Sequence, residues 1–355
     1  MDLMLIIPTE KEYEAKERFD QIVDDLSKDQ ETEIIYTAEE LEAAAEAGQL
    51  KNRRIIFAVR MDDFGINLEM IRMLRVLGNF RQPLKGSLGG IIVDGYGELY
   101  TKDTARKIVF EASMAGCTFP GKALVEATGS LNNFKVQAKN FKTTLAGAYK
   151  KSCLDLKNKV MDYQLDKIKV EDILVVHASS RKTSNSLALW NMVKDHLGSH
   201  VNVEEISIRD GEVWDCRGCK YEQCLHFGEN ARCFYGGVMV EKIYPAIKKC
   251  DAVVLICPNY NDSVSANIMA FINRLTALFR TNDFSSKKVF ALVVSGYSGG
   301  DLVAQQILGA MNMNKNFELP AGFALMETAN DPGTIVKIDN IEYKAADFAK
   351  NISGN

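Results

Sequence analysis

The sequence predicts an α/β protein of two three-layer domains in tandem, each built on a five-stranded parallel sheet. Three observations lead to this fold class. The chain has 355 residues, which exceeds the roughly 100–200 residues of a single domain. Short apolar runs alternate with longer segments of helical period, which is typical of strands joined by crossover helices. The order and spacing of these runs in the first half return in the second half.

The expected strands are short apolar runs that follow one another at similar spacing in each half. In the first half they cover residues 2–8, 32–37, 54–60, 89–95 and 123–128. In the second half they cover residues 173–178, 202–208, 252–258, 288–296 and 322–327. Helices are expected between them, because parallel strands need a crossover connection.

An internal repeat relates the two halves. One offset of 201 residues aligns identical residues near the last two expected strands of each half: Gly95 with Gly296, Tyr96 with Tyr297, Gly121 with Gly322, Ala123 with Ala324, Leu124 with Leu325, and Glu126 with Glu327. A slightly smaller offset lays RIIFAVRMDD over AVVLICPNYND, so the third strands and their loops correspond as well. Chance rarely maintains one offset so long, and the pattern predicts a tandem duplication.

The repeat sets the expected domain boundaries. Residues 1–135 form a first domain without cofactor, and residues 168–355 form a second domain with a cysteine-rich insertion at 215–233. Between them, residues 136–167 have helical composition without proline, which predicts a helical connector rather than a flexible linker.

Composition excludes several functional classes. A formal net charge of -4 gives no basic field for nucleic acid or for an anionic membrane. The opening apolar run is too short for a signal peptide, and no apolar stretch approaches the span of a bilayer, so we expect a cytoplasmic protein. Eight cysteines are too few for a disulfide scaffold in a chain this long.

The loop after the first strand of the second half carries an anion-binding pattern, HASSRKTSNSLAL. Its hydroxyls and cations, followed by a helix that starts near Asn185, suit a phosphate monoester. The residues are Ser179, Ser180, Arg181, Lys182, Thr183, Ser184, Asn185 and Ser186. The alternative is an ordinary Ser/Thr-capped helix start. The first half has PTEKEYEAKE here, whose carboxylates would repel phosphate, so only the second half is expected to bind it.

Two further loops follow the third and fourth strands of the second half. Pro258, Asn259, Tyr260 and Asn261 offer an aromatic face and backbone amides to a planar ring, where the first half has Arg60, Met61, Asp62 and Asp63. The segment SGYSGG then brings glycines that allow a close approach of the backbone to a ligand. Its residues are Ser295, Gly296, Tyr297, Ser298, Gly299 and Gly300. A glycine-rich turn is the alternative, but ligands bind where successive parallel strands end.

These loops resemble those of the flavodoxin-like NADPH-dependent FMN reductase and iron-sulfur flavoprotein family, over roughly residues 170–330. The family's phosphate loop, G-S-P-R-K-x-G-N-S, corresponds to residues 178–186, with its glycines and its proline replaced. Its P-x-Y element corresponds to Pro258-Asn259-Tyr260, and its later D-R to Asn273-Arg274. The resemblance implies that these loops hold the phosphate and isoalloxazine of FMN. The first half resembles a divergent flavodoxin-like relative without cofactor.

The cysteine-rich insertion reads DCRGCKYEQCLHFGENARC, in which Cys216, Cys219, Cys224 and Cys233 have the spacing C-x2-C-x4-C-x8-C. Four thiolates from one loop suit a [4Fe–4S] cluster or structural zinc. Iron-sulfur flavoproteins use a tighter run, so a metal-free thiol loop is a third alternative. The other cysteines, Cys117, Cys153, Cys250 and Cys257, have apolar or helical surroundings typical of packing residues.

The functional hypothesis is an FMN-dependent oxidoreductase. In it NAD(P)H is a substrate that gives a hydride to the flavin, and electrons pass to a small-molecule or protein acceptor, through the cysteine-held cluster where that is present. The flavin carries the chemistry, so no catalytic acid or base is assigned. A flavodoxin-like electron carrier and a zinc-ordered binding protein are the alternatives. We expect a homo-oligomer in which the first domain has a structural role.

Overall fold

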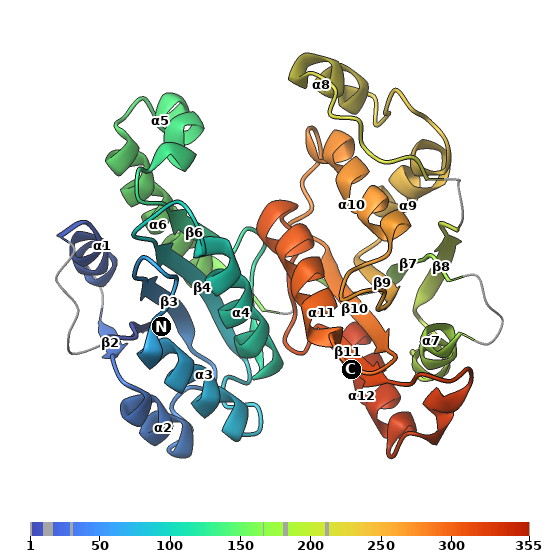
Figure 1. Ribbon diagram of the computed structural model, residues 1–355, viewed down its shortest axis with the longest axis horizontal. Helices are drawn as coiled ribbons and strands as arrows, with labels where there is room; N and C mark the ends of the chain where they lie inside the picture. The colour runs from blue at the N-terminus through green and yellow to red at the C-terminus, as the bar shows by residue number, and fades with distance from the viewer. Residues whose placement is uncertain are drawn as a thin grey trace. The chain divides into compact units, whose positions relative to one another are not determined.

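The computed structural model describes residues 2–9, 17–28, 31–165, 167–179, 184–209 and 213–354. The chain divides into two units, Met1–Leu165 and Asp166–Asn355. Each unit is an all-parallel sheet with helices packed on it, which confirms the predicted fold class (Figure 1). Among the described residues, no helix is both long enough and apolar enough to cross a membrane.

The first sheet has the order β2-β1-β3-β4-β5, and a sixth short strand, β6, also pairs with β4. β5 lies beside the start of β4 and β6 beside its end, so six strands fill five positions. The bounds are β1 (Leu3–Ile6), β2 (Thr32–Ile35), β3 (Arg54–Arg60), β4 (Ser87–Asp94), β5 (Cys117–Thr118) and β6 (Leu124–Ala127). The two-residue strand β5 is the one strand here that the apolar pattern did not predict.

The helices of the first unit are α1 (Glu17–Ser27), α2 (Ala38–Glu46), α3 (Leu68–Asn79), α4 (Thr101–Met114), η1 (Asn132–Phe134), α5 (Lys135–Phe141) and α6 (Leu145–Asp162). The local sequence determines where helix α2 begins. At α2, the Thr37 side chain accepts from the backbone N–H of Glu40, and the Glu40 carboxylate accepts from that of Thr37. This capping box satisfies donors that the first turn would otherwise leave unpaired.

The expected helical connector belongs to the first unit. Helix α6 buries Tyr149, Cys153, Leu156 and Val160 in the same core as the apolar side of α1 and alternate residues of β1 and β3. Each fully buried large apolar side chain contributes roughly 1.5–3 kcal/mol. The segment is helical as predicted, but α6 covers a face of the first sheet instead of only linking the two units.

The second sheet has the order β11-β10-β9-β7-β8. Its strands are β7 (Asp172–His177), β8 (Asn202–Ser207), β9 (Ala252–Pro258), β10 (Lys288–Ser295) and β11 (Ala324–Thr328). Its helices are α7 (Asn185–Asp195), α8 (Tyr221–Glu229), η2 (Met239–Ile243), α9 (Tyr244–Lys249), α10 (Ala266–Phe279), α11 (Gly300–Leu308), η3 (Gly309–Asn314), η4 (Thr334–Lys337) and α12 (Ile341–Ser353). Helices α7 and α12 share one core with β7, β9 and β10, in which Trp190 is fully buried and Phe348 meets Phe290 edge to face.

The two sheets share strand order and register. In chain order within each unit both follow 2-1-3-4-5, the order of a flavodoxin-like sheet. Ile91 pairs with Leu124 in the first sheet, and Leu292 pairs with Leu325 in the second. These positions differ by the offset of 201 residues found in the sequence, since 292 − 91 and 325 − 124 both equal 201. The repeat in the sequence is therefore also a repeat in the hydrogen-bonded pairing of strands.

Candidate functional site

The carboxyl edge of the second sheet brings the three predicted loops to neighbouring strands. β7 ends at His177, β9 at Pro258 and β10 at Ser295, and the three strands are adjacent in the order β7-β9-β10. The chain leaves β7 toward β8 on one side and continues at β9 on the other, so the strand order reverses between β7 and β9. Ligands of open parallel sheets bind at such a reversal, beyond the carboxyl ends of the strands.

The predicted phosphate loop lies between β7 and α7. Ser179 is half-buried, and Ser184 is the N-cap of α7, with its side chain accepting from the backbone N–H of Leu187 at 3.4 Å. Ser180, Arg181, Lys182 and Thr183 lie outside the described residues. The described ends of the loop thus place a helix N-terminus at the carboxyl edge, as an anion-binding loop requires.

Two of the predicted cofactor residues have other partners. The Asn185 amide donates to the carbonyls of Ala329 at 2.9 Å and Asp331 at 2.8 Å, and its oxygen accepts from the N–H of Ile335. Ser186 is 2% exposed and lies inside the fold. The Asn185 side chain therefore anchors the start of α7 to the loop after β11, and cofactor binding by Asn185 and Ser186 stays a prediction.

The loop after β9 is a tight hairpin. Tyr260 and Ser263 pair through both backbone hydrogen bonds, and Asn261 and Asp262 have φ of 53° and 56°. Two successive residues with positive φ are the signature of a type I′ turn, which Asn and Asp tolerate. The turn presents the Tyr260 ring, 58% exposed, at the carboxyl edge. Tyr260 is thus available to a planar ligand.

Side-chain contacts of Asn259 join this hairpin to the glycine-rich loop after β10. The Asn259 amide donates to Ser298 O at 2.7 Å and to Asp262 Oδ1 at 3.3 Å. Gly299, the N-cap of α11, has φ of 80°, and a Cβ there would collide with the Asp262 side chain. Only glycine combines this backbone with this close approach. The loop also leaves Tyr297 81% exposed between Gly296 and Ser298.

Three buried polar atoms at this edge have no hydrogen-bond partner among the described residues. They are Nδ1 of His177, Oδ1 of Asn259 and Oγ of Ser295, one at or next to the end of each adjacent strand. Buried polar groups in folded proteins are nearly always paired, so these three atoms are candidates to bind a polar ligand. His177 was not among the predicted residues, although its place directly before the predicted phosphate loop was a signal. Burial lowers the pKa of His177, which keeps the imidazole neutral near pH 7.

The four insertion cysteines are free thiols, with Cys216 exposed and the other three half-buried. Among the described residues no three Cys, His, Asp or Glu side chains lie close enough to hold a metal ion. The thiols nevertheless share neighbours. Burial chiefly raises the pKa of Tyr244, and Cys233, Cys224 and Cys216 act on it in the same direction. Cys219 Sγ contacts the Tyr235 hydroxyl at 3.9 Å. The thiols lie in one region without forming a closed ligand set.

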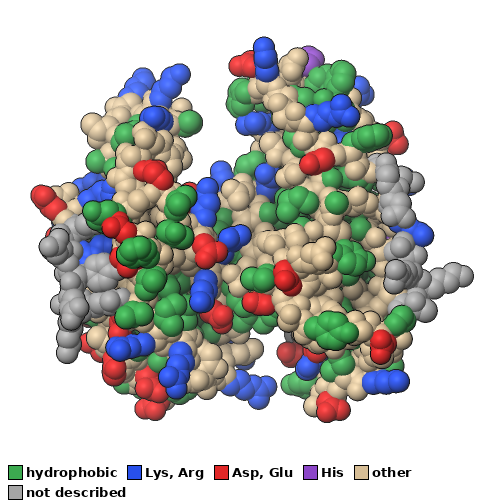
Figure 2. Space-filling view, in the orientation of Figure 1, with side chains coloured by type: hydrophobic (Ala, Val, Ile, Leu, Met, Phe, Trp, Pro, Cys, Tyr) green, Lys and Arg blue, Asp and Glu red, His purple; other side chains and the backbone are tan. Residues whose placement is uncertain are grey.

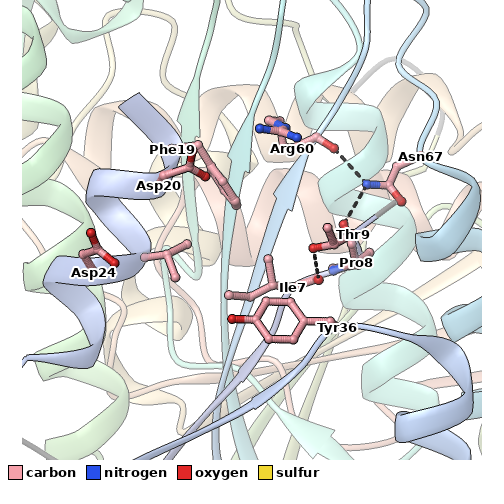
Figure 3. A pocket seen from close by; sticks show the side chains of 10 residues that line it. Ile7, Pro8, Thr9, Phe19, Asp20, Asp24, Tyr36, Arg60 and Asn67 are labelled. Atoms are coloured by element: carbon pink, nitrogen blue, oxygen red, sulfur yellow. Dashed lines mark hydrogen bonds between the residues drawn. The ribbon is translucent and has the colours of Figure 1, made fainter. Parts of the chain in front are cut away.

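The first unit has a cavity of about 270 Å³ at the carboxyl ends of β1 and β3 (Figure 3). It is lined by Ile7, Pro8, Thr9, Phe19, Asp20, Val23, Asp24, Tyr36, Arg60 and Asn67. The Asn67 amide closes one side by donating to Pro8 O at 3.1 Å and Arg60 O at 3.0 Å. The volume is below the roughly 300–1,000 Å³ of typical ligand pockets, and Asp20 and Asp24 disfavour an anion.

The last residue of β4 in the first unit has an internal partner. Asp94 is fully buried and accepts from both Nε and Nη2 of Arg18, at 2.9 Å and 2.5 Å. The Arg18 guanidinium also donates to the carbonyls of Thr128 and Gly129. By the offset of 201, Asp94 corresponds to Ser295, since both close equivalent strands. The first unit thus has an ion pair where the second has an unpartnered hydroxyl.

Comparison with known proteins identifies the family of the second unit. The parallel order and the three loops at the switch point define a flavodoxin-like α/β protein. Residues 172–331 match the NADPH-dependent FMN reductase family, and an iron-sulfur flavoprotein of Archaeoglobus fulgidus is 30% identical over 140 residues, 38% of this chain and 69% of that protein. The chain belongs to the NADPH-dependent FMN reductase family.

Similar solved structures include RosB with bound 8-demethyl-8-formylriboflavin-5'-phosphate, at 14% identity and a TM-score of 0.40, covering 52% of this chain and 77% of that one. Another is an FMN-dependent NADH-azoreductase from Bacillus anthracis in complex with FMN, at 10% identity and a TM-score of 0.36, covering 52% of this chain and 99% of that one.

Proposed function

We propose that the chain is an FMN-dependent NAD(P)H oxidoreductase with one FMN per chain, held at the carboxyl edge of the second sheet. The observation that carries the proposal is the set of unpartnered buried atoms of His177, Asn259 and Ser295 at three adjacent strand ends. FMN bound there would supply two-electron chemistry, with NAD(P)H as the hydride donor that becomes NAD(P)⁺ and an acceptor that receives both electrons.

The side chains divide this binding task. Ser179, Arg181, Lys182, Thr183 and Ser184, with the first amides of α7, bind the phosphate. The hairpin of Pro258, Asn259, Tyr260 and Asn261 and the loop from Ser295 to Gly300 bind the ring, because Tyr260 and Tyr297 expose aromatic faces there. Asn259 fixes the distance between these loops. The acceptor is a small molecule, such as a quinone or another flavin, or a redox protein.

Anaerobic titration with NADPH and NADH tests the reaction. The yellow absorbance of the FMN-loaded protein should bleach rapidly with at least one of the two nucleotides, and oxidised acceptor should restore it. A loaded protein that neither nucleotide reduces would instead be an electron carrier.

On the face that Figure 2 shows, basic and acidic side chains are intermixed, so this face offers no surface of a single charge sign to a highly charged acceptor.

FMN stoichiometry tests the role of the first unit. We propose that this unit is a degenerate copy, produced by duplication, that no longer binds flavin. The acidic cavity and the Arg18–Asp94 pair at its carboxyl edge support this. Protein saturated with FMN and then desalted should contain about one flavin per chain, because only one unit offers a phosphate loop. A ratio near two would refute the assignment.

We propose further that Cys216, Cys219, Cys224 and Cys233 hold a [4Fe–4S] cluster. Their thiol chemistry and the shared neighbours Tyr244 and Tyr235 support it, although the described arrangement must close before four thiolates reach one centre. Such a cluster passes electrons singly.

Changing Cys219 to Ala should remove bound iron and sulfide from anaerobically prepared protein. FMN content should stay near the wild-type value, because the flavin loops lie in other segments of the chain. Cys153→Ala is the control, since Cys153 is 1% exposed within the first unit. Iron-free wild-type protein with four alkylatable thiols would contradict the cluster, and one bound zinc per chain would favour the zinc alternative.

A further inference from the structure

Arg274 is a buried arginine beside the cysteine segment, residues 215–233. Its side chain leaves α10 and is only 2% exposed. Nη2 donates to Gly236 O at 2.7 Å, and Nη1 donates to Trp214 O at 3.5 Å. Trp214 directly precedes the cysteine segment, and Gly236 lies three residues beyond Cys233. One guanidinium therefore contacts both ends of the stretch that carries the four cysteines.

The partners of the Arg274 side chain among the described residues are backbone carbonyls. Among the described residues no Asp or Glu lies within ion-pair distance of it, and its Nε has no hydrogen-bond partner. The buried Lys288 differs in this respect, because its Nζ lies 4.0 Å from the Glu318 carboxylate. A buried charge without a counter-charge is strongly unfavourable, because backbone carbonyls replace only part of the lost hydration.

The surroundings of Arg274 identify where a negative charge could be. The Tyr244 hydroxyl donates to the Arg274 carbonyl at 2.6 Å, and Tyr244 is fully buried. Cys219 Sγ lies 3.9 Å from the hydroxyl of Tyr235, which directly precedes Gly236 in the chain. The carbonyl that Arg274 Nη2 contacts thus belongs to the residue after the phenol that Cys219 contacts.

We propose that Arg274 is the positioning residue of the cysteine segment: it clamps the two ends of the segment and supplies the counter-charge for an anionic group held by Cys216, Cys219, Cys224 and Cys233. Four thiolates around either an iron-sulfur core or a zinc ion carry net negative charge. The counter-charge role of Arg274 rests on the proposed metal-binding function of these cysteines. Its role as a clamp does not, because the clamp holds the cysteine segment whether or not metal is bound.

Amide hydrogen exchange of the metal-free full chain tests the clamp. In Arg274→Gln and Arg274→Lys, peptides covering residues 213–236 should exchange about tenfold faster, because neither side chain can hold both carbonyls and a charged hydrogen bond contributes about 1.4 kcal/mol or more. Arg280→Gln is the matched control: Arg280 also lies at the end of α10 and stacks over Tyr221, but it is exposed and contacts neither carbonyl. Its exchange should stay within about twofold of wild type.

Metal uptake tests the counter-charge. After anaerobic reconstitution with iron and sulfide, or with zinc alone, Arg274→Lys should retain most of the metal and Arg274→Gln should lose at least about tenfold in occupancy. If both variants exchange amide hydrogens at the wild-type rate, the clamp is refuted. If the Gln and Lys variants bind equal amounts of metal, the counter-charge role is refuted. If wild type binds neither metal, the cysteine assignment fails and the counter-charge fails with it, while exchange still decides the clamp. A loss of the fluorescence of buried Trp190 would show that the Gln variant does not fold. In that case the exchange of Arg274→Lys alone decides the clamp.

Discussion

Replacing Arg181 and Ser184 together with alanine should weaken FMN binding by about a hundredfold or more. A hydrogen bond to a charged group contributes roughly 1.5–3 kcal/mol, and the phosphate would lose at least two such bonds. Ser184 stands at the N-terminus of α7, where backbone amides favour an anion. Arg181 lies outside the described residues, between Ser179 and Ser184 in the sequence. Titration of the flavin-free protein with FMN measures the effect.

Riboflavin is the matched ligand control for this variant. It lacks the phosphate, so the double variant should bind it as wild type does, and the difference between the two ligands isolates the phosphate contacts. Ser186→Ala is the matched protein control, because Ser186 lies in the same helix but is 2% exposed and points into the fold. Unchanged FMN affinity in the double variant, or an equal loss for riboflavin, would contradict the proposed phosphate loop.

The strands were predictable because parallel strands covered on both faces are nearly continuous apolar runs. RIIFAVR and AVVLICP illustrate this: both are strands in the structure, and each is buried along almost its whole length. The offset of 201 residues also identifies equivalent positions of β4 and β10. The pairing of β4 with β6 and of β10 with β11 follows the same offset. The role of α6 was not predictable from its composition, because helical period does not say which sheet a helix will cover.

The candidate site was predictable as loops but not as individual contacts. The sequence placed Asn185 in a phosphate loop, whereas its amide binds the carbonyls of Ala329 and Asp331, about 145 residues further along the chain. Such long-range partners leave no local pattern in a sequence. His177 was missed as a candidate residue for a related reason, because the burial of its Nδ1 without a partner depends on how distant segments pack. Residue type and spacing thus pointed to the carboxyl edge of the second sheet, whereas tertiary packing determines which side chains face that edge.

Changing Arg18 to Ala should destabilise the first unit by about 3 kcal/mol, because it leaves the Asp94 carboxylate buried without its counter-charge. This is the low end of the range for a broken buried pair, since the Arg18 side chain is 25% exposed and water can screen part of the charge. Lys151→Ala is the control: Lys151 pairs with Asp155 on the surface, both side chains are half exposed, and its loss should cost less than about 1 kcal/mol.

The chain allows the two units to be followed separately in one denaturant titration. Both tryptophans, Trp190 and Trp214, lie in the second unit, so their fluorescence reports its unfolding, whereas far-UV circular dichroism reports both units. Arg18→Ala should lower the midpoint of the dichroism transition of the first unit and leave the fluorescence midpoint and FMN affinity unchanged. Adding Asp94→Asn should restore more than half of the lost stability, because the amide removes the uncompensated charge. A double variant as unstable as Arg18→Ala would show that Arg18 stabilises the unit through packing rather than by neutralising Asp94.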